Sequence, residues 1–214
     1  MRDAGAFLRA HTTVAHAPLV PEIALHLATE ITPIWQATEA WLEREGVAPP
    51  FWAFAWPGSV AVARLLLDRP ELVRGRRVLD FAAGCGLAAI AAARAGAASV
   101  DAAEIDPMAV AAIRLNAALN GVAVAALAED VVGQPCRWDR VVAGDVCYEA
   151  PMARRILPWL RSLAAAGAEV WLADPGRAYV PIDGLEPVAR LAVPVTRELE
   201  DRDVREVVVS RLLP

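Results

Sequence analysis

The stretch VLDFAAGCG, residues 78–86, decides the fold of this chain. It joins an apolar, strand-forming run that contains one acid, Asp80, to a turn of small residues, and a helix-forming segment follows. Small residues allow the backbone of such a turn to approach a ligand closely, and the first amides of the next helix are free to bind it. The stretch therefore predicts a strand–turn–helix unit at a ligand site.

Strands and helices alternate on the carboxyl side of this turn. The chain predicts strands at Arg77–Phe81, Ser99–Glu104, Val122–Leu127, Asp139–Ala143 and Glu169–Ala173, and helices at Cys85–Ala95, Asp106–Asn120 and Met152–Ala165. Such alternation is typical of parallel strands joined by right-handed crossovers, with helices on both faces of the sheet. We therefore expect an α/β, Rossmann-like fold.

The two ends of the chain depart from this alternation. Near the carboxyl end, two β-rich runs, Leu191–Glu198 and Arg205–Leu212, flank the polar turn Leu199–Asp203 and predict an antiparallel hairpin at the sheet edge. The complete sheet is then mostly parallel and seven-stranded. At the other end, Pro21–Leu27 and Pro33–Arg44 predict helices.

A shift in composition near Pro49–Pro50 divides the chain into a helical extension, residues 1–49, and a main domain, residues 50–214. The aromatic segment Pro50–Gly58 opens the main domain. The following stretch, Ser59–Leu67, predicts a helix with Ser59 at its N-cap.

Composition narrows the class of protein. The 214 residues are 57% hydrophobic and 22% charged, enough for one packed core and against extensive disorder. The net charge of -5 disfavours binding to nucleic acid or to anionic membranes. The three cysteines lack the spacing of a zinc site or a disulfide framework, and no signal peptide is evident. We expect a cytoplasmic protein without a metal centre, and the oligomeric state is open.

Acidic residues follow successive predicted strands. Glu104 lies 18 residues beyond Gly86, and an acid at about this spacing accepts hydrogen bonds from ribose hydroxyls in strand–helix–strand units. Asp130 follows the third strand, where it would accept from an adenine amino group or be an exposed loop acid. Because ligands of open sheets bind at the carboxyl ends of the strands, these acids predict a nucleoside site there. Ala89, where a dinucleotide fingerprint has glycine, disfavours NAD.

Several segments together resemble the electron-transfer flavoprotein β-subunit lysine methyltransferases, over about residues 21–177. The resemblance rests on PFWAFAWPG (50–58) with LLLDRP (65–70), on VLDFAAGCG (78–86) with EIDP (104–107) and residues 115–120, on GDVCYE (144–149), and on DPGR (174–177). The chain departs from the usual glycine pattern at Ala82. Alanine suits this position if the backbone there does not need a positive φ.

The resemblance implies a class I methyltransferase fold and S-adenosylmethionine as cofactor. It implies that Asp80, Gly84 and Gly86 hold the methionine part of the cofactor, that Glu104 binds the ribose with Ile105 beside it, and that Asp130 binds the adenine edge. Trp56 would pack over the cofactor pocket. Asp145 and Tyr148 would face the reactive methyl group, with Asp145 also in contact with the cofactor. The alternatives are that Asp145 caps loop amides and that Tyr148 is a half-buried loop aromatic.

The implied activity is N-methylation of a lysine on a protein partner, with the electron-transfer flavoprotein β subunit as the expected substrate. A ribosomal-protein lysine or a small amine is the alternative acceptor. Two hypotheses of another class are an NAD-dependent Rossmann oxidoreductase, which would bind NAD, and a cofactor-binding module without catalysis.

Overall fold

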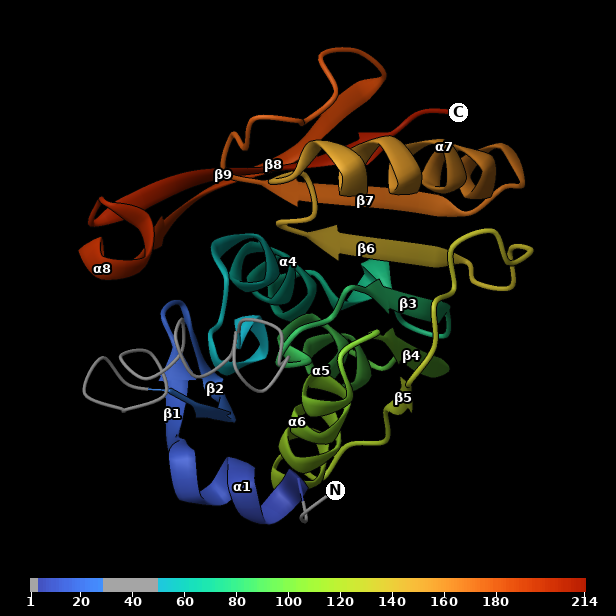
Figure 1. Cartoon of the computed structure of the whole chain (residues 1–214). Helices are drawn as coiled ribbons and strands as arrows, with labels where there is room; N and C mark the ends of the chain where they lie inside the picture. Colours follow the sequence, from blue (N-terminus) through green and yellow to red (C-terminus); the bar gives the residue numbers. More distant parts are fainter. Residues whose placement is uncertain (1–3, 29–49) are drawn as a thin grey trace.

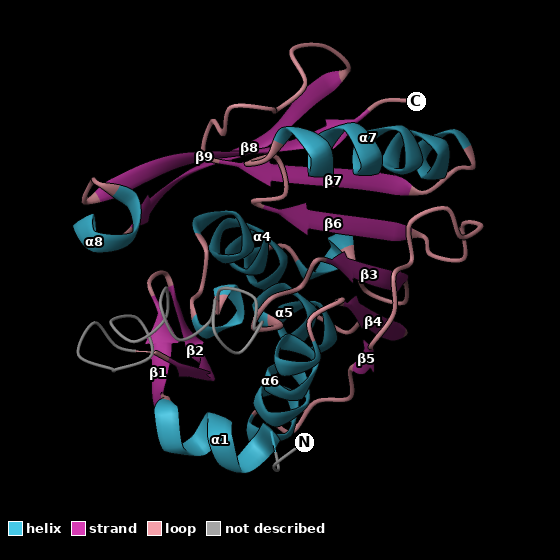
Figure 2. Cartoon of the chain, viewed as in Figure 1, coloured by secondary structure: helices cyan, strands magenta, loops and turns pink. Residues whose placement is uncertain are grey.

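The computed structural model of the chain describes residues 4–28 and 50–214, which include a seven-stranded sheet with the order β5-β4-β3-β6-β7-β9-β8 (Figures 1 and 2). The strands are β3 (Arg77–Phe81), β4 (Ser99–Ala103), β5 (Ala125–Leu127), β6 (Arg140–Gly144), β7 (Glu169–Asp174), β8 (Leu185–Pro194) and β9 (Val204–Leu212). The pairs from β5 to β7 are parallel, whereas β9 is antiparallel to both β7 and β8. The predicted fold class is confirmed.

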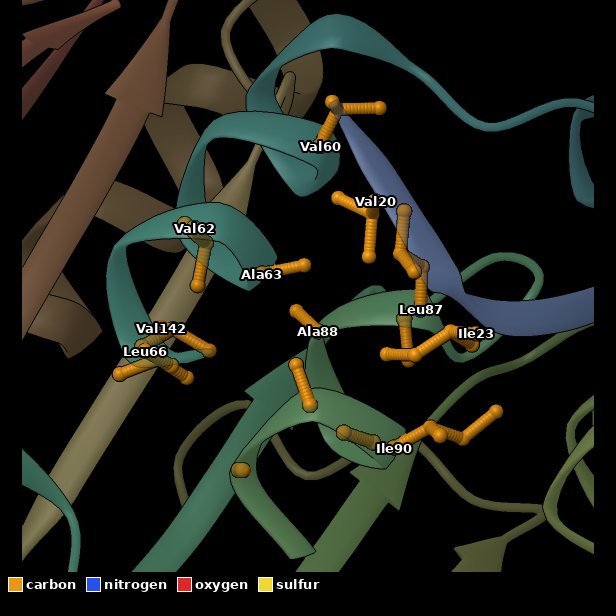
Figure 3. Packing of buried hydrophobic residues seen from close by; sticks show 14 of the residues in the cluster. Val20, Ile23, Val60, Val62, Ala63, Leu66, Leu87, Ala88, Ile90 and Val142 are labelled. Atoms are coloured by element: carbon orange, nitrogen blue, oxygen red, sulfur yellow. The ribbon is translucent and has the colours of Figure 1, made fainter. Parts of the chain in front are cut away.

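Helices cover both faces of this sheet. On one face, α4 (Pro57–Asp68) and α5 (Leu87–Arg94) pack through small and branched residues against each other and against the strands (Figure 3). The adjoining helix α6 (Pro107–Leu119) begins as predicted, because the Asp106 side chain accepts a hydrogen bond from the Met108 amide at 2.8 Å. On the other face, α7 (Ala150–Ala165) buries a separate apolar cluster. The sheet is therefore shielded from water on both sides.

The helix predicted for Pro21–Leu27 is wrong, because these residues belong to strand β2 (Val20–Leu27). The strand pairs with β1 (Thr13–Ala17), which follows the short helix α1 (Ala4–His11). Alternate residues of β2 turn inward, as Ile23 and Leu25 do, and both are fully buried. This two-residue period is that of a strand. The helix predicted at 33–44 lies outside the described residues, and the boundary at residue 49 stays a prediction.

Two asparagines, Asn116 of α6 and Asn120 at the C-cap of that helix, fasten β2 to the main domain. The Asn116 side chain accepts a hydrogen bond from the His26 amide at 2.8 Å and donates one to the Cys85 carbonyl at 2.9 Å. Asn120 accepts from the Ala24 amide at 3.1 Å and donates to the Ala24 carbonyl at 2.6 Å. These side chains satisfy backbone groups along the free edge of β2, so the β1–β2 hairpin is held against the helix that follows the second strand of the parallel sheet.

Several element boundaries differ from the predicted ones, and those of α4, β5 and β8 bear on the site. Helix α4 starts at Pro57, two residues before Ser59, so Ser59 is not its N-cap. The third parallel strand is limited to β5 and ends at Leu127. Strand β8 starts at Leu185, before the predicted Leu191, and ends at Pro194, before the predicted Glu198. A short helix, α8 (Arg197–Glu200), takes the end of that predicted strand and the start of the predicted polar turn. The described part of the chain has no helix with the length and apolar character needed to cross a membrane.

Candidate active site

The turn after β3 contains three residues with left-handed backbone conformation. The φ values are 53° at Ala82, 54° at Gly84 and 81° at Gly86. The condition under which alanine suits position 82 is therefore not met, since the turn does require a positive φ there. A Cβ placed on Gly84 would meet nothing within 4 Å, whereas one on Gly86 would lie 3.2 Å from Ile113 Cγ1. Gly84 thus faces open space, and Gly86 permits close packing of α5 against α6.

The side chain of Asp80, in the strand before this turn, stabilises the start of the helix after it. Its carboxylate is almost fully buried and accepts a hydrogen bond from the Ala89 amide, in the first turn of α5, at 2.8 Å. Burial raises the pKa of Asp80 to about 7. The acid therefore connects the end of β3 to the start of the next helix, and its implied contact with the methionine part of the cofactor stays a prediction.

Glu104 immediately follows β4 and reaches the turn. One carboxylate oxygen, Oε2, accepts from the Gly84 amide at 3.1 Å, and Oε1 accepts from the Ile105 amide at 2.9 Å. Burial raises the pKa of Glu104, against the lowering effect of these amides. The Ile105 side chain beside it is 73% exposed. The structure therefore brings together Gly84, Glu104 and Ile105, three of the predicted cofactor-binding residues.

Asp130 lies apart from this group, three residues beyond the end of β5. Its exposed carboxylate forms an ion pair with Arg155 of α7 and accepts a hydrogen bond from the Val132 amide at 3.0 Å. The hydrogen bond from Arg155 lowers the pKa of Asp130. Each oxygen of this carboxylate already accepts one hydrogen bond, and the expected role of Asp130 at the adenine edge stays a prediction.

Asp145 follows β6 with a positive φ of 56° and has a buried carboxylate. Its Oδ2 accepts from the Gly58 amide at 2.5 Å, and its Oδ1 accepts from Nε and Nη2 of Arg177 at 3.1 and 2.8 Å. Burial raises the pKa of Asp145 to about 6, although Arg177 lowers it. Asp145 thus accepts from an amide in the first turn of α4, an orphan amide of a helix and not of a loop. Its expected place beside the reactive methyl group stays a prediction.

Two glycines permit this contact between α4 and the carboxyl edge of the sheet. A Cβ on Gly58 would lie 2.5 Å from the Ala173 carbonyl oxygen and 2.6 Å from Asp145 Oδ2. A Cβ on Gly144 would lie 2.7 Å from the Ser59 amide nitrogen. The glycine of the quoted WPG segment is therefore required by close packing, and it places the helix N-terminus against the loop that carries Asp145.

The site contains a buried ion network that the sequence analysis did not assign. Arg177, of the quoted DPGR turn, bonds Glu200 through Nη1 at 3.0 Å and Nη2 at 2.5 Å, while it also bonds Asp145. Glu200 is 3% exposed and also accepts from Arg205 Nε at 2.7 Å. Asp174 accepts from the Arg177 amide at 2.6 Å. The DPGR motif marks one end of this network, but Glu200 lies in a predicted polar turn without a motif.

Aromatic side chains flank the network. Phe51 lies in a short 3-10 helix, Phe51–Ala53, and its ring centroid is 5.8 Å from that of Tyr148 and 5.9 Å from that of Trp56. Trp56 donates its indole N–H to the Phe51 carbonyl at 2.8 Å. Burial raises the pKa of Tyr148, and the nearby carboxylates of Glu149 and Glu104 raise it further. Tyr148 therefore packs against Phe51 and is 40% exposed, and its expected role at the reactive methyl group stays a prediction.

Comparison with known proteins identifies the family. The family model of ribosomal protein L11 methyltransferase (PrmA) matches residues 65–146. The electron transfer flavoprotein beta subunit lysine methyltransferase of Xenopus laevis is 41% identical over 195 residues, which cover 87% of this chain and 78% of that protein. The chain belongs to this methyltransferase family. The human member is 38% identical, over 80% of this chain and 66% of its own length.

Solved structures of other methyltransferases share the fold of this family member. Magnesium protoporphyrin IX methyltransferase from Synechocystis PCC 6803, with bound SAM, has a TM-score of 0.54 and 17% identity, over 73% of this chain and 78% of that one. The T. Thermophilus 16S rRNA N2 G1207 methyltransferase, in complex with AdoMet and guanosine, has a TM-score of 0.52 and 22% identity, over 75% of this chain and 44% of that one. At such identities the likeness concerns the fold.

The chain is an S-adenosylmethionine-dependent methyltransferase, as its family membership shows. The described residues fit this cofactor, because the turn at Gly84 faces open space and the carboxylate of Glu104 stands beside it as an acceptor for hydroxyl groups. The NAD-dependent oxidoreductase and the non-catalytic module are thereby set aside.

Proposed function

We propose that the chain transfers the methyl group of S-adenosylmethionine to the ε-amine of a lysine on a protein, and that this protein is the electron-transfer flavoprotein β subunit. The observation that carries the proposal is the 41% identity, over 87% of this chain, to a methyltransferase named for that substrate. The net charge of -5 supports a lysine-bearing protein partner and disfavours nucleic acid and anionic membranes. We also propose a cytoplasmic location.

The charge of the buried network suits a cationic acceptor. Within the described network, the carboxylates of Asp145 and Glu200 pair with the guanidiniums of Arg177 and Arg205, and the carboxylate of Asp174 accepts from the Arg177 backbone amide. If all five groups are ionised, one negative charge remains uncompensated. An acidic surplus beside the carboxyl ends of β6 and β7 attracts a lysine ammonium and stabilises the charged amine that methylation produces.

The chemistry divides between the cofactor and the chain. The cofactor would supply a methyl group activated by a sulfonium. The neutral amine attacks the methyl carbon in line, so that the C–N bond forms as the C–S bond breaks, the thioether leaves, and the methylated ammonium releases a proton to solvent. A lysine attacks only when neutral, although its usual pKa is about 10.4. Partial burial and a nearby positive charge favour the neutral amine, whereas a carboxylate opposes its deprotonation. Asp145 therefore orients the amine and does not activate it alone, and alignment supplies most of the rate. Tyr148 either donates a hydrogen bond to the acceptor amine or lines the channel that admits it.

A methyl-transfer assay tests this function. Purified protein with radiolabelled S-adenosylmethionine should label a lysine of the recombinant electron-transfer flavoprotein β subunit and should leave recombinant ribosomal protein L11 unlabelled. Label on L11 alone, or on a small amine alone, would show that the proposed substrate is wrong. Absence of label on any protein of a cell lysate would contradict lysine methylation itself.

The role of Asp145 is tested by Asp145→Ala in the same assay. We expect loss of methyl transfer by about a hundredfold or more, because alignment of the amine is lost, while calorimetry still detects cofactor binding. Asp139→Ala is the matched control, since Asp139 pairs with Arg77 at the opposite end of the strands. Full activity of Asp145→Ala would refute its assignment to the site.

A further inference from the structure

The carboxylate of Asp145 is oriented by a guanidinium that a second buried acid holds in place. Arg177 binds Asp145 through Nε and Nη2, and it binds Glu200 through Nη1 and Nη2, so both edges of its planar fork are used. The fork is rigid, and its plane fixes the relative placement of both carboxylates. A displacement of Glu200 therefore reorients Arg177 and, through it, Asp145.

Burial and a second arginine hold Glu200 in a fixed position beside Arg177. Glu200 ends the short helix α8 and is 3% exposed, although it lies 55 positions from Asp145 in the sequence. Arg205 of β9 holds it from the other side, through Nε to Oε2 at 2.7 Å and through Nη2 to the Glu200 carbonyl at 3.1 Å. Figure 1 shows α8 at the end of the β8–β9 hairpin, on the side toward which the carboxyl ends of β6 and β7 point.

Burial of this acid has an energetic cost that local packing does not explain. Taking a carboxylate out of water is unfavourable unless it is paired, and pairs of this kind are often no more stabilising than apolar residues of the same volume. An exposed pair is present in the same connection, between Arg197 and Asp203, and closes the loop without burial. The buried Arg177–Glu200 pair is the one that reaches Asp145.

We propose that Glu200 is a positioning residue for methyl transfer, which acts through Arg177 to hold the carboxylate of Asp145 against the acceptor amine. The proposal rests on the proposed lysine methyltransferase function. It makes the β8–β9 hairpin a part of the catalytic apparatus. The charges that face Asp145 are those of Arg177 and Asp174, with the Cys147 thiol and the Gly58 amide also adjacent.

Kinetics of Glu200→Gln test the proposal, with the electron-transfer flavoprotein β subunit as acceptor. The amide keeps the shape of the side chain but weakens its bonds to Arg177. We expect kcat to fall between about tenfold and a hundredfold, because misplacement of an orienting group acts on the chemical step. The Kd for S-adenosylmethionine and the KM for the acceptor should stay within about twofold of the wild-type values, because Glu200 is buried behind Arg177 and the proposal gives it no contact with either ligand.

Glu200→Asp separates positioning from folding. It keeps the charge and restores part of the kcat, while its shorter side chain lowers the melting temperature as much as Glu200→Gln does. Asp203→Asn removes a carboxylate from the same connection and should leave kcat unchanged. Activity that follows melting temperature across the three variants, or a Glu200→Gln protein with more than half of the wild-type kcat, would overturn the proposal.

A spectroscopic measurement tests the coupling between Glu200 and Asp145 without relying on the proposed lysine methyltransferase activity. If the wild-type protein labels no acceptor, the lysine methyltransferase assignment fails, and carbon-13 NMR of the aspartate carboxyl groups still examines the contact. Glu200→Gln removes a negative charge that is linked to Asp145 through Arg177, so less repulsion opposes ionisation of Asp145 and its pKa should fall. An unchanged pKa of Asp145 in Glu200→Gln would show that the two acids are not coupled and would overturn the inference.

Discussion

Ala82 is the residue at which the cofactor turn carries backbone strain. Its φ of 53° places an L-residue with a side chain in the left-handed region, where glycine is favoured. The sequence shows the missing glycine but not the backbone angle, because the angle depends on how β3 meets α5. Glu104 could be predicted, since its spacing from the turn follows from the strand–helix–strand unit. The Asp130–Arg155 ion pair could not, because it depends on the packing of α7.

Ala82→Gly should stabilise the protein in the absence of cofactor. Relief of the left-handed conformation is worth about 1 kcal/mol after the extra freedom of glycine in the unfolded chain is subtracted. The melting temperature should rise by about 2–4 °C for a chain of this size. Ala93→Gly, inside helix α5, is the control and should lower it. A lower melting temperature for Ala82→Gly would show that the alanine methyl group contributes packing that outweighs the strain.

Asp80→Asn should change how stability depends on pH. The folded pKa of Asp80 is raised to about 7, so its contribution to stability is full below the unfolded pKa, near 4, and is lost as the pH rises to about 7. The slope reaches at most about 1.4 kcal/mol per pH unit. The asparagine variant, which still accepts from the Ala89 amide, should equal the wild type near pH 4 and exceed it near pH 7.5. A difference in the free energy of unfolding between variant and wild type that is the same at every pH in this range would contradict the raised pKa of Asp80.

Helix α4 is the element that connects the aromatic entry segment to the carboxyl edge of the sheet. Its existence could be predicted from the apolar pattern, but its start could not, because the acceptor for its Gly58 amide is Asp145, which is distant in sequence. The strand β2 was mistaken for a helix for a similar reason. Its backbone groups are satisfied by β1, by Asn116 of α6 and by the C-cap residue Asn120, and local sequence does not reveal such partners.

Gly58→Ala should displace this helix. The new Cβ would lie 2.5 Å from the Ala173 carbonyl oxygen and 2.6 Å from Asp145 Oδ2, so the helix start has to move off the sheet edge. We expect a loss of about 1–3 kcal/mol in the free energy of unfolding from overpacking, although alanine is the better helix former. Chemical denaturation measures it, with Ser59→Ala as the control one position along. An increased free energy of unfolding for Gly58→Ala would show that the helix can move away from the sheet edge without loss of stability.

At the scale of the whole molecule, the mostly parallel sheet with its edge hairpin and its cofactor edge could be predicted from the sequence, whereas the network behind that edge could not. Alternation of strands and helices leads to a parallel sheet whose ligand edge is defined by topology. The Asp145–Arg177–Glu200 network joins three separate segments, and only its first two members lie in recognisable motifs. Contacts between a parallel core and an antiparallel hairpin depend on tertiary packing, so no local pattern predicts Glu200.

Calorimetric titration of S-adenosylmethionine into the wild-type protein and into Glu104→Gln tests the central claim that the cofactor binds at the carboxyl ends of β3 and β4. Glu71→Gln, which changes an exposed acid after α4, is the control. Loss of charged hydrogen bonds to the ribose should weaken binding by about tenfold to a hundredfold in Glu104→Gln, and the control should match the wild type. Equal affinity of all three proteins for the cofactor would contradict the account.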